Sequence, residues 1–532
     1  MIYQIYPRSF FDSNGDGIGD LAGIVRKLDY IAGLGVDAVW ISPFFVSPMC
    51  DFGYDVADFR GVDPVFGTLD DFDRLVARAH ALGLKVLIDQ IWGHSSDRHP
   101  WFLDSRRSSD SGRAEWYVWA DPKPDGTPPN NWLSVFGGPA WQWEPRRRQY
   151  YLHHFLPSQP TLNLRNEAVV TELLDIGTFW LDRGIDGFRL DAVDFLLHDP
   201  GLRDNPPEPP PDGNIPAKLF GLQRHVHDML HPDIAAILRR IRGLMDRYPG
   251  RTTLAEVSSQ SGAFERIGGY TEGNDQLHMA YTLQPSPGRF DRAAVRRLHA
   301  ASGNRRGWAA WSFSNHDVER AVSRWPPSPD APIDPDFARL LMGLMLSLRG
   351  SISVYQGEEL ALPDATVAPE DMRDPFGIAF YPEYRGRDGS RTPMPWIADA
   401  PQAGFTAGIP WLPIDPHHIG SSVDRQESDP GSALQTWRRF LRWRRAHPAL
   451  IDGDLDSIEA PEPLVAFRRS TREESVLVVL NLSNRPAPLP ETLLAGTHPL
   501  SGHGFAVPQQ DNGIVLPRYG MLFAAAETVT RE

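Results

Sequence analysis

Short apolar, β-branched runs alternate with amphipathic helical patterns from the first residues to about residue 450. Strands that alternate with helices form a parallel sheet, and eight such units are the number found in a TIM (β/α)8 barrel. We therefore predict an α/β fold built on that barrel. The helices expected between strands are Leu21–Leu34, Leu69–Leu82, Glu167–Arg183, Pro232–Tyr248 and Asp336–Leu348. The eight expected strands are Ile2–Tyr6, Ala38–Ser42, Lys85–Gln90, Gly187–Leu190, Thr252–Val257, Leu277–Thr282, Trp308–Phe313 and Ser351–Tyr355.

This pattern is interrupted twice and then changes. Residues 95–163 are rich in Trp, Pro, Gly and Asn and have little helical periodicity, which predicts an irregular lobe inserted after strand 3. A loop excursion at about 360–411 follows the eighth strand. From residue 450 onward, short alternating runs predict a C-terminal antiparallel β-sandwich. The expected organisation is thus 1–94 and 164–449 for the two parts of the barrel, 95–163 for the lobe and 450–532 for the C-terminal β domain.

Composition and charge narrow the class of protein. The chain has 532 residues, a formal net charge of −15 and a single cysteine, Cys50. Negative charge disfavours nucleic acid and anionic membranes as partners. No apolar run approaches the roughly 20 residues of a membrane span, and no secretory signal is visible. One cysteine cannot form an intrachain disulfide, which favours a reducing compartment, so we expect a cytoplasmic protein. The sequence does not indicate an oligomeric state.

Acidic and imidazole side chains follow five of the predicted strands. Arg189 and Asp191 are two residues apart on the fourth strand and so project to the same face. The guanidinium is expected to keep Asp191 ionised. Because barrel strands end at one face of the molecule, these side chains are expected to converge there. The acids and histidines concerned are Asp51, Asp55, Asp89, His94, Asp191, Glu256, His316 and Asp317.

The chemistry of this set is restricted by what the chain lacks. It has no nucleophile-elbow serine, no Cys–His candidate and none of the His or Cys spacings of zinc sites, which disfavours acyl transfer and zinc chemistry. A general acid with a carboxylate nucleophile is the arrangement that cleaves glycosidic bonds. Alone, the Arg189–Asp191 pair would more often be a structural ion pair.

Several motifs give the chain a specific resemblance. It reads Asp-Gly-Phe-Arg-Leu-Asp at 186–191, Ala-Glu-Val at 255–257 and Ser-Asn-His-Asp at 314–317. In this order, on these strands, the motifs resemble the α-amylase superfamily, glycoside hydrolase family 13. The opening Tyr-Gln-Ile-Tyr-Pro-Arg-Ser-Phe, with Gln-Pro-Thr-Leu-Asn at 159–163 and the run 387–396, is similar to the α-glucosidase and oligo-1,6-glucosidase branch.

The resemblance implies a role for each matching residue. Asp191 would be the nucleophile, Glu256 the general acid/base and Asp317 the third acid, which stabilises the transition state. Arg189 would hold Asp191 ionised. Either Arg387 or Arg391 would close the sugar pocket, with Arg387 preferred. The expected substrate-binding residues are Tyr54, Asp55, His94, Phe155, Arg189, His316 and Arg387.

A metal is predicted in one loop, and no organic cofactor is expected. Oxygen donors in this loop fall at positions 1, 3, 5, 7 and 9 of a calcium-loop pattern, with Gly17 at the sixth. The twelfth position is Gly23 and not Glu, so the loop is not a full EF-hand. Relatives bind calcium or magnesium there, which implies one structural Ca²⁺ or Mg²⁺; a turn-rich connector without metal is the alternative. The expected ligands are Asp12, Asn14, Asp16, the Ile18 carbonyl and Asp20.

The inserted lobe and long rims predict a blind pocket that admits a chain end. We therefore expect exo-action on small glucosides and maltose-like oligosaccharides. In this branch Ala or Thr after the nucleophile goes with α-1,4 preference and Val with α-1,6, and here the residue is Ala192. An aromatic-rich rim could hold a second sugar or an alcohol acceptor, so transglucosylation is expected beside hydrolysis. The rim residues are Trp92, Phe136, Trp141, Trp143 and Phe155.

Other functions are also compatible with the sequence. Within the enzyme class they are an oligo-1,6-glucosidase, a sucrose isomerase or a trehalose-type hydrolase. A non-catalytic relative that binds sugar or accompanies a transporter would show eroded acids or a membrane span, and the sequence shows neither.

Overall fold

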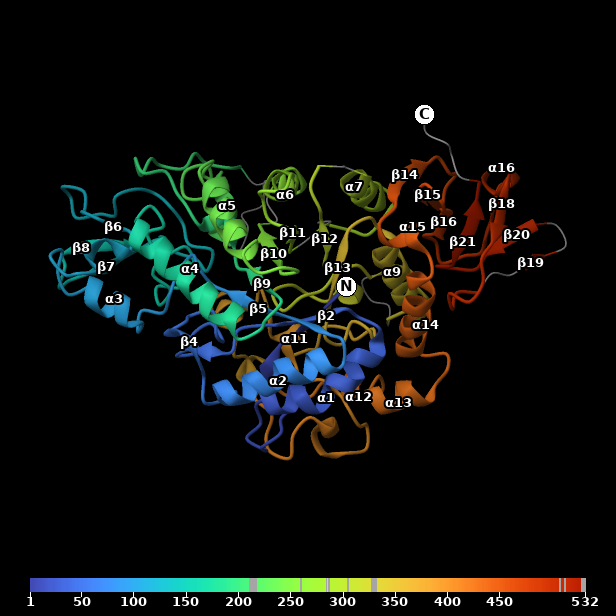
Figure 1. The fold of residues 1–532 in the computed structure, drawn as a ribbon, viewed down its shortest axis with the longest axis horizontal. Coiled ribbons are helices and arrows are strands. Elements are labelled where there is room, and N and C mark those ends of the chain that lie inside the picture. The colour runs from blue at the N-terminus through green and yellow to red at the C-terminus, as the bar shows by residue number, and fades with distance from the viewer. Residues whose placement is uncertain are drawn as a thin grey trace.

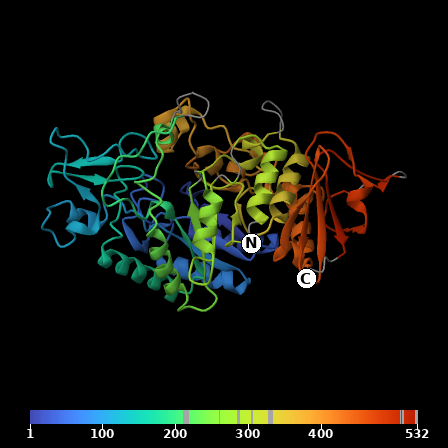
Figure 2. The same cartoon turned by 90° about the horizontal axis from the view of Figure 1, so that it is seen from above.

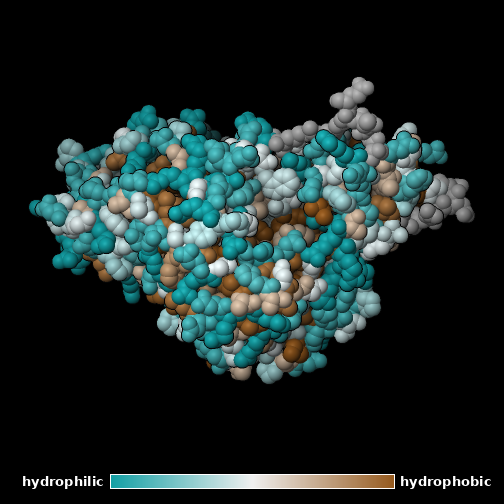
Figure 3. Space-filling model, in the orientation of Figure 1, coloured by the Kyte–Doolittle hydropathy of each residue, from teal (hydrophilic) through white to brown (hydrophobic). Residues whose placement is uncertain are grey.

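The computed structural model describes residues 1–209, 218–258, 261–283, 285, 288–303, 306–326, 333–506, 509–510 and 513–527. The barrel lies at the centre of the molecule, between the inserted lobe and the C-terminal domain (Figure 1). Among the described residues, no helix is both long and apolar enough to span a bilayer. Hydrophilic residues cover most of the face seen in Figure 3, with smaller apolar patches between them.

Eight parallel strands form the barrel, in the spatial order β11-β10-β9-β5-β2-β1-β13-β12. A parallel bridge between Ala280 and Ala309 joins the two ends of this sheet and closes it. The predicted TIM barrel is therefore confirmed. Its strands are β1 (Ile2–Ile5), β2 (Ala38–Ile41), β5 (Lys85–Gln90), β9 (Gly187–Leu190), β10 (Thr252–Val257), β11 (Met279–Thr282), β12 (Ala310–Trp311) and β13 (Ser351–Tyr355).

Four strands are shorter than the sequence predicts, and β1 and β2 each lose only their last predicted residue. The strand expected over Trp308–Phe313 pairs regularly only at Ala310 and Trp311, because the chain then turns, with the Ser312 hydroxyl donating to the Ser314 carbonyl. The strand expected from Leu277 begins at Met279.

Helices pack around the barrel, and their ends follow local sequence signals. Thr68 and Asp71 form a capping box at the start of one helix. Gly35, with φ of 88°, ends another in the left-handed conformation that glycine adopts readily. The surrounding helices are α1 (Leu21–Leu34), α2 (Leu69–Ala81), α4 (Glu167–Asp182), α5 (Ile234–Met245), α6 (Ala263–Thr271), α7 (Arg292–Gly303) and α9 (Pro335–Ser347).

Strand register decides which side chains enter the barrel. Ile2, Trp40, Leu87 and Leu254 form an interior cluster, while alternate residues pack outward against the helices. Arg189 of β9 is the register partner of both Asp89 on β5 and Leu254 on β10. Because side chains alternate along a strand, Asp89, Arg189 and, two residues beyond Leu254, Glu256 all face inward.

The inserted lobe is more regular than predicted. It carries the helix α3 (Pro100–Ser105) and an antiparallel sheet of β6 (Trp119–Ala120), β8 (Gln149–Leu152) and β7 (Trp141–Glu144). Val118, Trp132, Trp141 and Leu152 form a small apolar core beneath this sheet. Short strands interrupted by Gly and Pro carry too little periodicity to predict from sequence. A two-stranded ribbon, β3 (Phe45–Val46) with β4 (Asp58–Val62), lies in the loop after β2.

The C-terminal domain contains two antiparallel sheets, as predicted (Figure 2). One face of the larger sheet joins the main core, where Phe523 packs 5.3 Å from Phe440 of α14 (Ala433–Arg445). Leu477, Val479 and Leu522 alternate to the other face and form the core between the sheets. The larger sheet is β14 (Asp454–Ile458), β15 (Leu464–Ser470), β16 (Ser475–Asn481), β21 (Met521–Ala526) and β18 (Thr497–Pro499); the smaller is β17 (Ala487–Pro488), β20 (Gly513–Leu516) and β19 (Gln509–Gln510).

Candidate active site

A buried arginine joins three carboxylates at the carboxyl ends of the central strands. Arg189 Nη1 lies 2.6 Å from Asp89 Oδ1 and 2.7 Å from Asp191 Oδ1, and its Nη2 contacts Glu256 Oε2. Tyr281 accepts a hydrogen bond of 2.8 Å from the same Nη2. Asp191 and Glu256 are therefore neighbours on one guanidinium.

The electrostatics of this cluster differ from the sequence-based expectation. Arg189 was expected to hold Asp191 ionised, and it also contacts Asp89 and Glu256. Burial raises the pKa of the Asp191 carboxyl above its ordinary value, and Arg189 and His94 act against that rise. Burial likewise raises the pKa of Asp89 to about 7. The two-residue spacing predicted the contact between Arg189 and Asp191. The contacts with Asp89 on β5 and Glu256 on β10 depend on how the strands are aligned in the barrel.

Asp317 is held by two arginines on the opposite side. Its Oδ1 lies 3.0 Å from Arg387 Nη1 and 3.0 Å from Arg391 Nη2. Burial acts to raise its pKa, but His316, Arg387 and Arg391 hold the pKa of the Asp317 carboxyl well below its usual range. Both candidate arginines thus reach this acid. Arg387 alone continues to Asp51 Oδ1, at 2.7 Å.

His316 is a buried, neutral group behind the three acids. Burial lowers its pKa to about 3. Gln4 Nε2 lies 2.7 Å from Nδ1, and because an amide nitrogen only donates, Nδ1 accepts and the proton is on Nε2. Nε2 lies 2.6 Å from the Tyr54 hydroxyl and 3.1 Å from Asp317 Oδ2. His316 therefore orients Tyr54 and Asp317.

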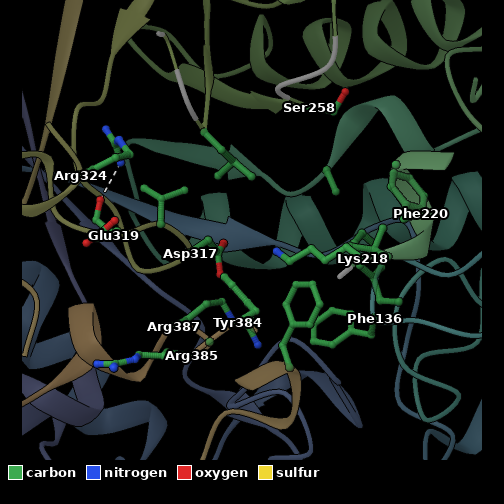
Figure 4. A pocket seen from close by; sticks show the side chains of 18 of the residues that line it. Phe136, Lys218, Phe220, Ser258, Asp317, Glu319, Arg324, Tyr384, Arg385 and Arg387 are labelled. Atoms are coloured by element: carbon green, nitrogen blue, oxygen red, sulfur yellow. Dashed lines mark hydrogen bonds and ion pairs between the residues drawn. The ribbon is translucent and has the colours of Figure 1, made fainter. Parts of the chain in front are cut away.

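These groups open into a large cavity of about 1760 Å³. Its wall mixes carboxylates with phenyl rings, such as Phe136, Phe155, Phe195 and Phe220, a composition that suits a ligand with polar edges and apolar faces. Figure 4 shows part of the wall, with Asp317 and Arg387 beside Tyr384 and Phe136 across from them. The acids in the lining near the strand ends are Asp51, Asp191, Glu256 and Asp317.

Comparison with known proteins agrees with this geometry. The model of the α-amylase catalytic domain matches residues 4–453. The chain belongs to the α-amylase family. It is a glycoside hydrolase.

Individual relatives match over nearly the whole chain. A probable α-glucosidase of Rhizobium meliloti is 51% identical over 98% of this chain and 96% of its own length. An oligo-1,6-glucosidase of Heyndrickxia coagulans is 34% identical, over 91% of each chain. The crystal structure of the α-glucosyl transfer enzyme XgtA superposes with a TM-score of 0.94 at 49% identity, covering 99% of this chain and 98% of that one.

Most of the predicted site residues of this α-amylase family member lie together. Tyr54, His94 and Phe155 line the cavity with the acids named above. His94 Nε2 donates to the Tyr54 carbonyl at 2.9 Å, which orients its ring. Arg189 and His316 are fully buried and lie behind the lining.

Asp55 was expected to bind substrate, and this expectation is corrected. Its carboxylate accepts hydrogen bonds from the Ser47 hydroxyl and from the N–H groups of Cys50 and Asp51, at 2.9–3.0 Å. Asp55 therefore stabilises its own loop and does not line the cavity. Asp51 lines the cavity at the position that was expected for Asp55. Asp51 and Asp55 both lie in the Asp-Phe-Gly-Tyr-Asp run after the second strand, so the sequence does not distinguish them. The direction of each side chain depends on the turn of the loop at Phe52, where φ is 49°.

The expected aromatic rim is also only partly correct. Phe136 and Phe155 line the cavity. Trp92 packs against Phe188, with 5.9 Å between the rings, Trp141 lies in the core of the lobe, and Trp143 is on the surface. An aromatic residue in a Gly- and Pro-rich segment gives no signal of the direction in which it points.

Several residues in or directly behind the cavity wall were missed by sequence reasoning. Asp374 binds Arg387 at 2.7 Å, and Gln159 Nε2 donates to Asp51 at 3.1 Å. Gln159 begins the Gln-Pro-Thr-Leu-Asn motif that resembles the α-glucosidase branch, and this motif could have indicated a site residue. Asp374 and Lys218 lie in loops without periodicity and had none.

The predicted metal loop is ordered by its own hydrogen bonds. The Asp12 carboxylate accepts from the N–H groups of Asn14, Gly15 and Gly17 at 2.7–2.9 Å, and Asp20 accepts from Ser13 at 3.0 Å. Within the described part of the chain, no three His, Cys, Asp or Glu side chains form a ligand group for an ion. The predicted set also includes the Asn14 side chain and the Ile18 carbonyl, and the cation stays a prediction.

Proposed function

We propose that this chain is a retaining, exo-acting α-glucosidase. It hydrolyses terminal α-1,4-linked glucose from short oligosaccharides and α-glucosides through a covalent β-glucosyl-aspartate on Asp191, and it also transfers glucose to sugar or alcohol acceptors. The observation that carries this proposal is the contact of Asp191 and Glu256 with the same guanidinium, that of Arg189.

The closeness of these carboxylates supports retention. A retaining glycosidase needs its two carboxyls only about 5–5.5 Å apart, whereas an inverting one leaves room for a water molecule between them. Asp191 and Glu256 contact adjacent nitrogens of one arginine, so little room is left for a water molecule between them. This arrangement favours direct attack by a carboxylate over attack by water.

The proposed reaction follows from these positions. An ionised Asp191 oxygen attacks the anomeric carbon while Glu256 gives its proton to the leaving oxygen, so the glycosidic bond breaks as the ester bond forms. Glu256, now ionised, takes a proton from water or from an acceptor hydroxyl, whose oxygen displaces Asp191. Asp317, ionised between its arginines, is suited to hold sugar hydroxyls in the distorted transition state.

The contact between Arg387 and Asp51 supports exo-action. These residues come from the segments after β13 and β2, and their ion pair of 2.7 Å joins those segments beside Asp317. A sugar ring seated there would meet this pair at its non-reducing end, so only a terminal glucose would fit.

The rest of the cavity supports acceptor binding. Phe136, Phe195 and Phe220 line it beyond the acids, and apolar surface of this kind holds a sugar face or an alkyl or aryl alcohol. The similarity to a structure named for α-glucosyl transfer adds to this support.

Initial rates on maltose, isomaltose, sucrose and trehalose, measured side by side, test the substrate assignment. We expect kcat/KM to be highest for maltose. Faster turnover of isomaltose would instead make the chain an oligo-1,6-glucosidase, and faster turnover of sucrose or trehalose would favour the remaining alternatives.

Ala192 is expected to control linkage preference. It lines the cavity directly after Asp191 and has φ of 41° and ψ of 49°, a left-handed conformation that β-branched residues strongly disfavour. Ala192→Val adds two methyl groups beside the bond being cleaved, and we expect the maltose-to-isomaltose ratio of kcat/KM to fall about tenfold or more. Ala192→Gly, which accepts this backbone, is the matched control and should keep the maltose preference. An unchanged ratio in Ala192→Val would contradict this role.

We also propose that a divalent cation binds the Asp12–Asp20 loop, supported by the spacing of its oxygen donors. Calcium added after chelation should raise the melting temperature by several degrees, because a ligand that binds only the folded state stabilises it. Asp16 is exposed, and Asp16→Asn keeps an oxygen for the Ile18 N–H while removing a charge, so it should diminish the calcium effect. A melting temperature that does not respond to calcium or chelator would leave the loop as a metal-free connector.

A further inference from the structure

Lys218 places a cation in the cavity wall between two aromatic rings. Its Nζ lies 3.9 Å from the centre of the Phe376 ring and 3.8 Å from that of Tyr384. Within the described part of the chain, no carboxylate oxygen lies within 4.0 Å of this nitrogen. Figure 4 shows the Lys218 side chain extending across the cavity toward Asp317. The two rings are therefore its main partners.

Both rings belong to the segment that carries Arg387. Phe376 is in α10 (Pro375–Phe380), whose N-cap is Asp374, and Asp374 accepts from Arg387 Nη2 at 2.7 Å. Tyr384 precedes Arg387 by three residues. Arg387 in turn contacts Asp317 at 3.0 Å. A continuous series of contacts thus leads from Lys218 to the third acid.

A residue of the inserted lobe meets the same point. Phe136 lies 4.7 Å from Phe376, ring centre to ring centre, and the Arg387 guanidinium lies 5.2 Å from the centre of the Phe136 ring. Phe376 is therefore contacted by the lobe and by the segment after β9. The contact from the lobe is between two phenyl rings, Phe136 and Phe376, whereas the contact from the segment after β9 brings the charge of Lys218 to Phe376.

We propose that Lys218 is a positioning residue, whose ammonium holds Phe376 and Tyr384 and so keeps Arg387 in place against Asp317 and Asp51. This use of the residue in substrate binding rests on the proposed glucosidase function. Asp191 and Glu256 stand on other strands, so the attack itself does not depend on Lys218. Loss of the contact should weaken substrate binding more than it slows bond cleavage, and KM should rise more than kcat falls.

The contact also makes binding sensitive to alkaline pH. Burial, followed by the nearby Arg387, lowers the pKa of Lys218 to about 8, against the opposing effect of Asp374 and Asp317. Tyr384, whose pKa burial raises to about 12, stays neutral over this range. As pH rises through about 8, Lys218 loses its proton and the cation–π attraction with it, so KM should rise.

Two variants separate the charge from the packing. Lys218→Met keeps an unbranched apolar side chain, one atom shorter, but removes the charge, and we expect a rise in KM of about tenfold at pH 7 with kcat changed less than threefold. Lys218→Arg keeps a charge that does not titrate below pH 12, so it should retain a low KM and lose the rise in KM between pH 7 and 9.5. A KM of Lys218→Met equal to the wild-type value at pH 7 would overturn the inference.

A second measurement does not depend on activity. Thermal unfolding of Lys218→Met, Tyr384→Leu and the double variant forms a cycle that measures the coupling between the two residues. A combined loss smaller than the sum of the single losses supports the contact, and additive losses overturn it. If the wild-type chain turns over no α-glucoside at all, the proposed function fails, while the cycle still decides the Lys218 contact.

Discussion

Replacement of Asp191 by Asn is expected to lower kcat on an aryl α-glucoside by about 10⁴-fold or more, because it removes the nucleophile while preserving the shape of the side chain. The amide can still accept a hydrogen bond from Arg189 Nη1, which lies 2.7 Å from Asp191 Oδ1 in the wild-type chain. Folding should therefore be little affected. Steady-state kinetics, with circular dichroism as a check of folding, measure the effect.

The control for this variant is an acid outside the site. Asp125 is exposed in the inserted lobe, and Asp125→Asn should retain wild-type kcat. Asp191→Asn should also form no glucosyl-enzyme, detected as a mass increase after rapid quenching. Activity of Asp191→Asn within tenfold of wild type would mean that another group carries the glucosyl unit.

Replacement of Glu256 by Gln is expected to have an effect that depends on the leaving group. Without a proton donor, kcat/KM on maltose should fall about 10²–10⁴-fold. An aryl glucoside with an acidic phenol needs little protonation, so its first step should be much less affected and the second step should become rate-limiting. A burst of phenol, followed by a slow steady state, is the expected time course.

Azide offers a test specific to Glu256. As a nucleophile that needs no general base, it should restore turnover of the aryl glucoside by Glu256→Gln and give an α-glucosyl azide. In Asp191→Asn, which forms no intermediate, any reaction with azide would be a single direct displacement and would give the β-glucosyl azide instead. If maltose and the aryl glucoside lose activity equally, and azide has no effect, Glu256 is not the acid/base.

Much of the barrel could be predicted because its signals are local. The strand Lys85–Gln90 has the predicted ends, and the helix Leu21–Leu34 begins and ends at capping residues that can be read directly from the sequence. The positions of Asp191, Glu256 and Asp317, at or just after predicted strands, also singled out these acids. The lobe could not be predicted in this way, since β6 and β7 contain only two and four residues.

The details of the site depend on contacts between distant segments. Arg189 reaches Asp89 and Glu256 through barrel register, and Asp51 lines the cavity in place of Asp55 because of one turn of a loop. Lys218 meets Phe376 across 158 positions of the chain. Such contacts arise only when the fold is complete, so sequence spacing does not reveal them.

The stereochemistry of the first product tests the central claim most directly. Proton NMR during the first minutes of hydrolysis of an aryl α-glucoside, which releases a single glucose, distinguishes the two anomers of that glucose before mutarotation. Two displacements at the same carbon, the first by Asp191, retain configuration, so α-glucose should appear first. Initial release of β-glucose would mean a single displacement by water and would contradict the assignment of Asp191 as the nucleophile.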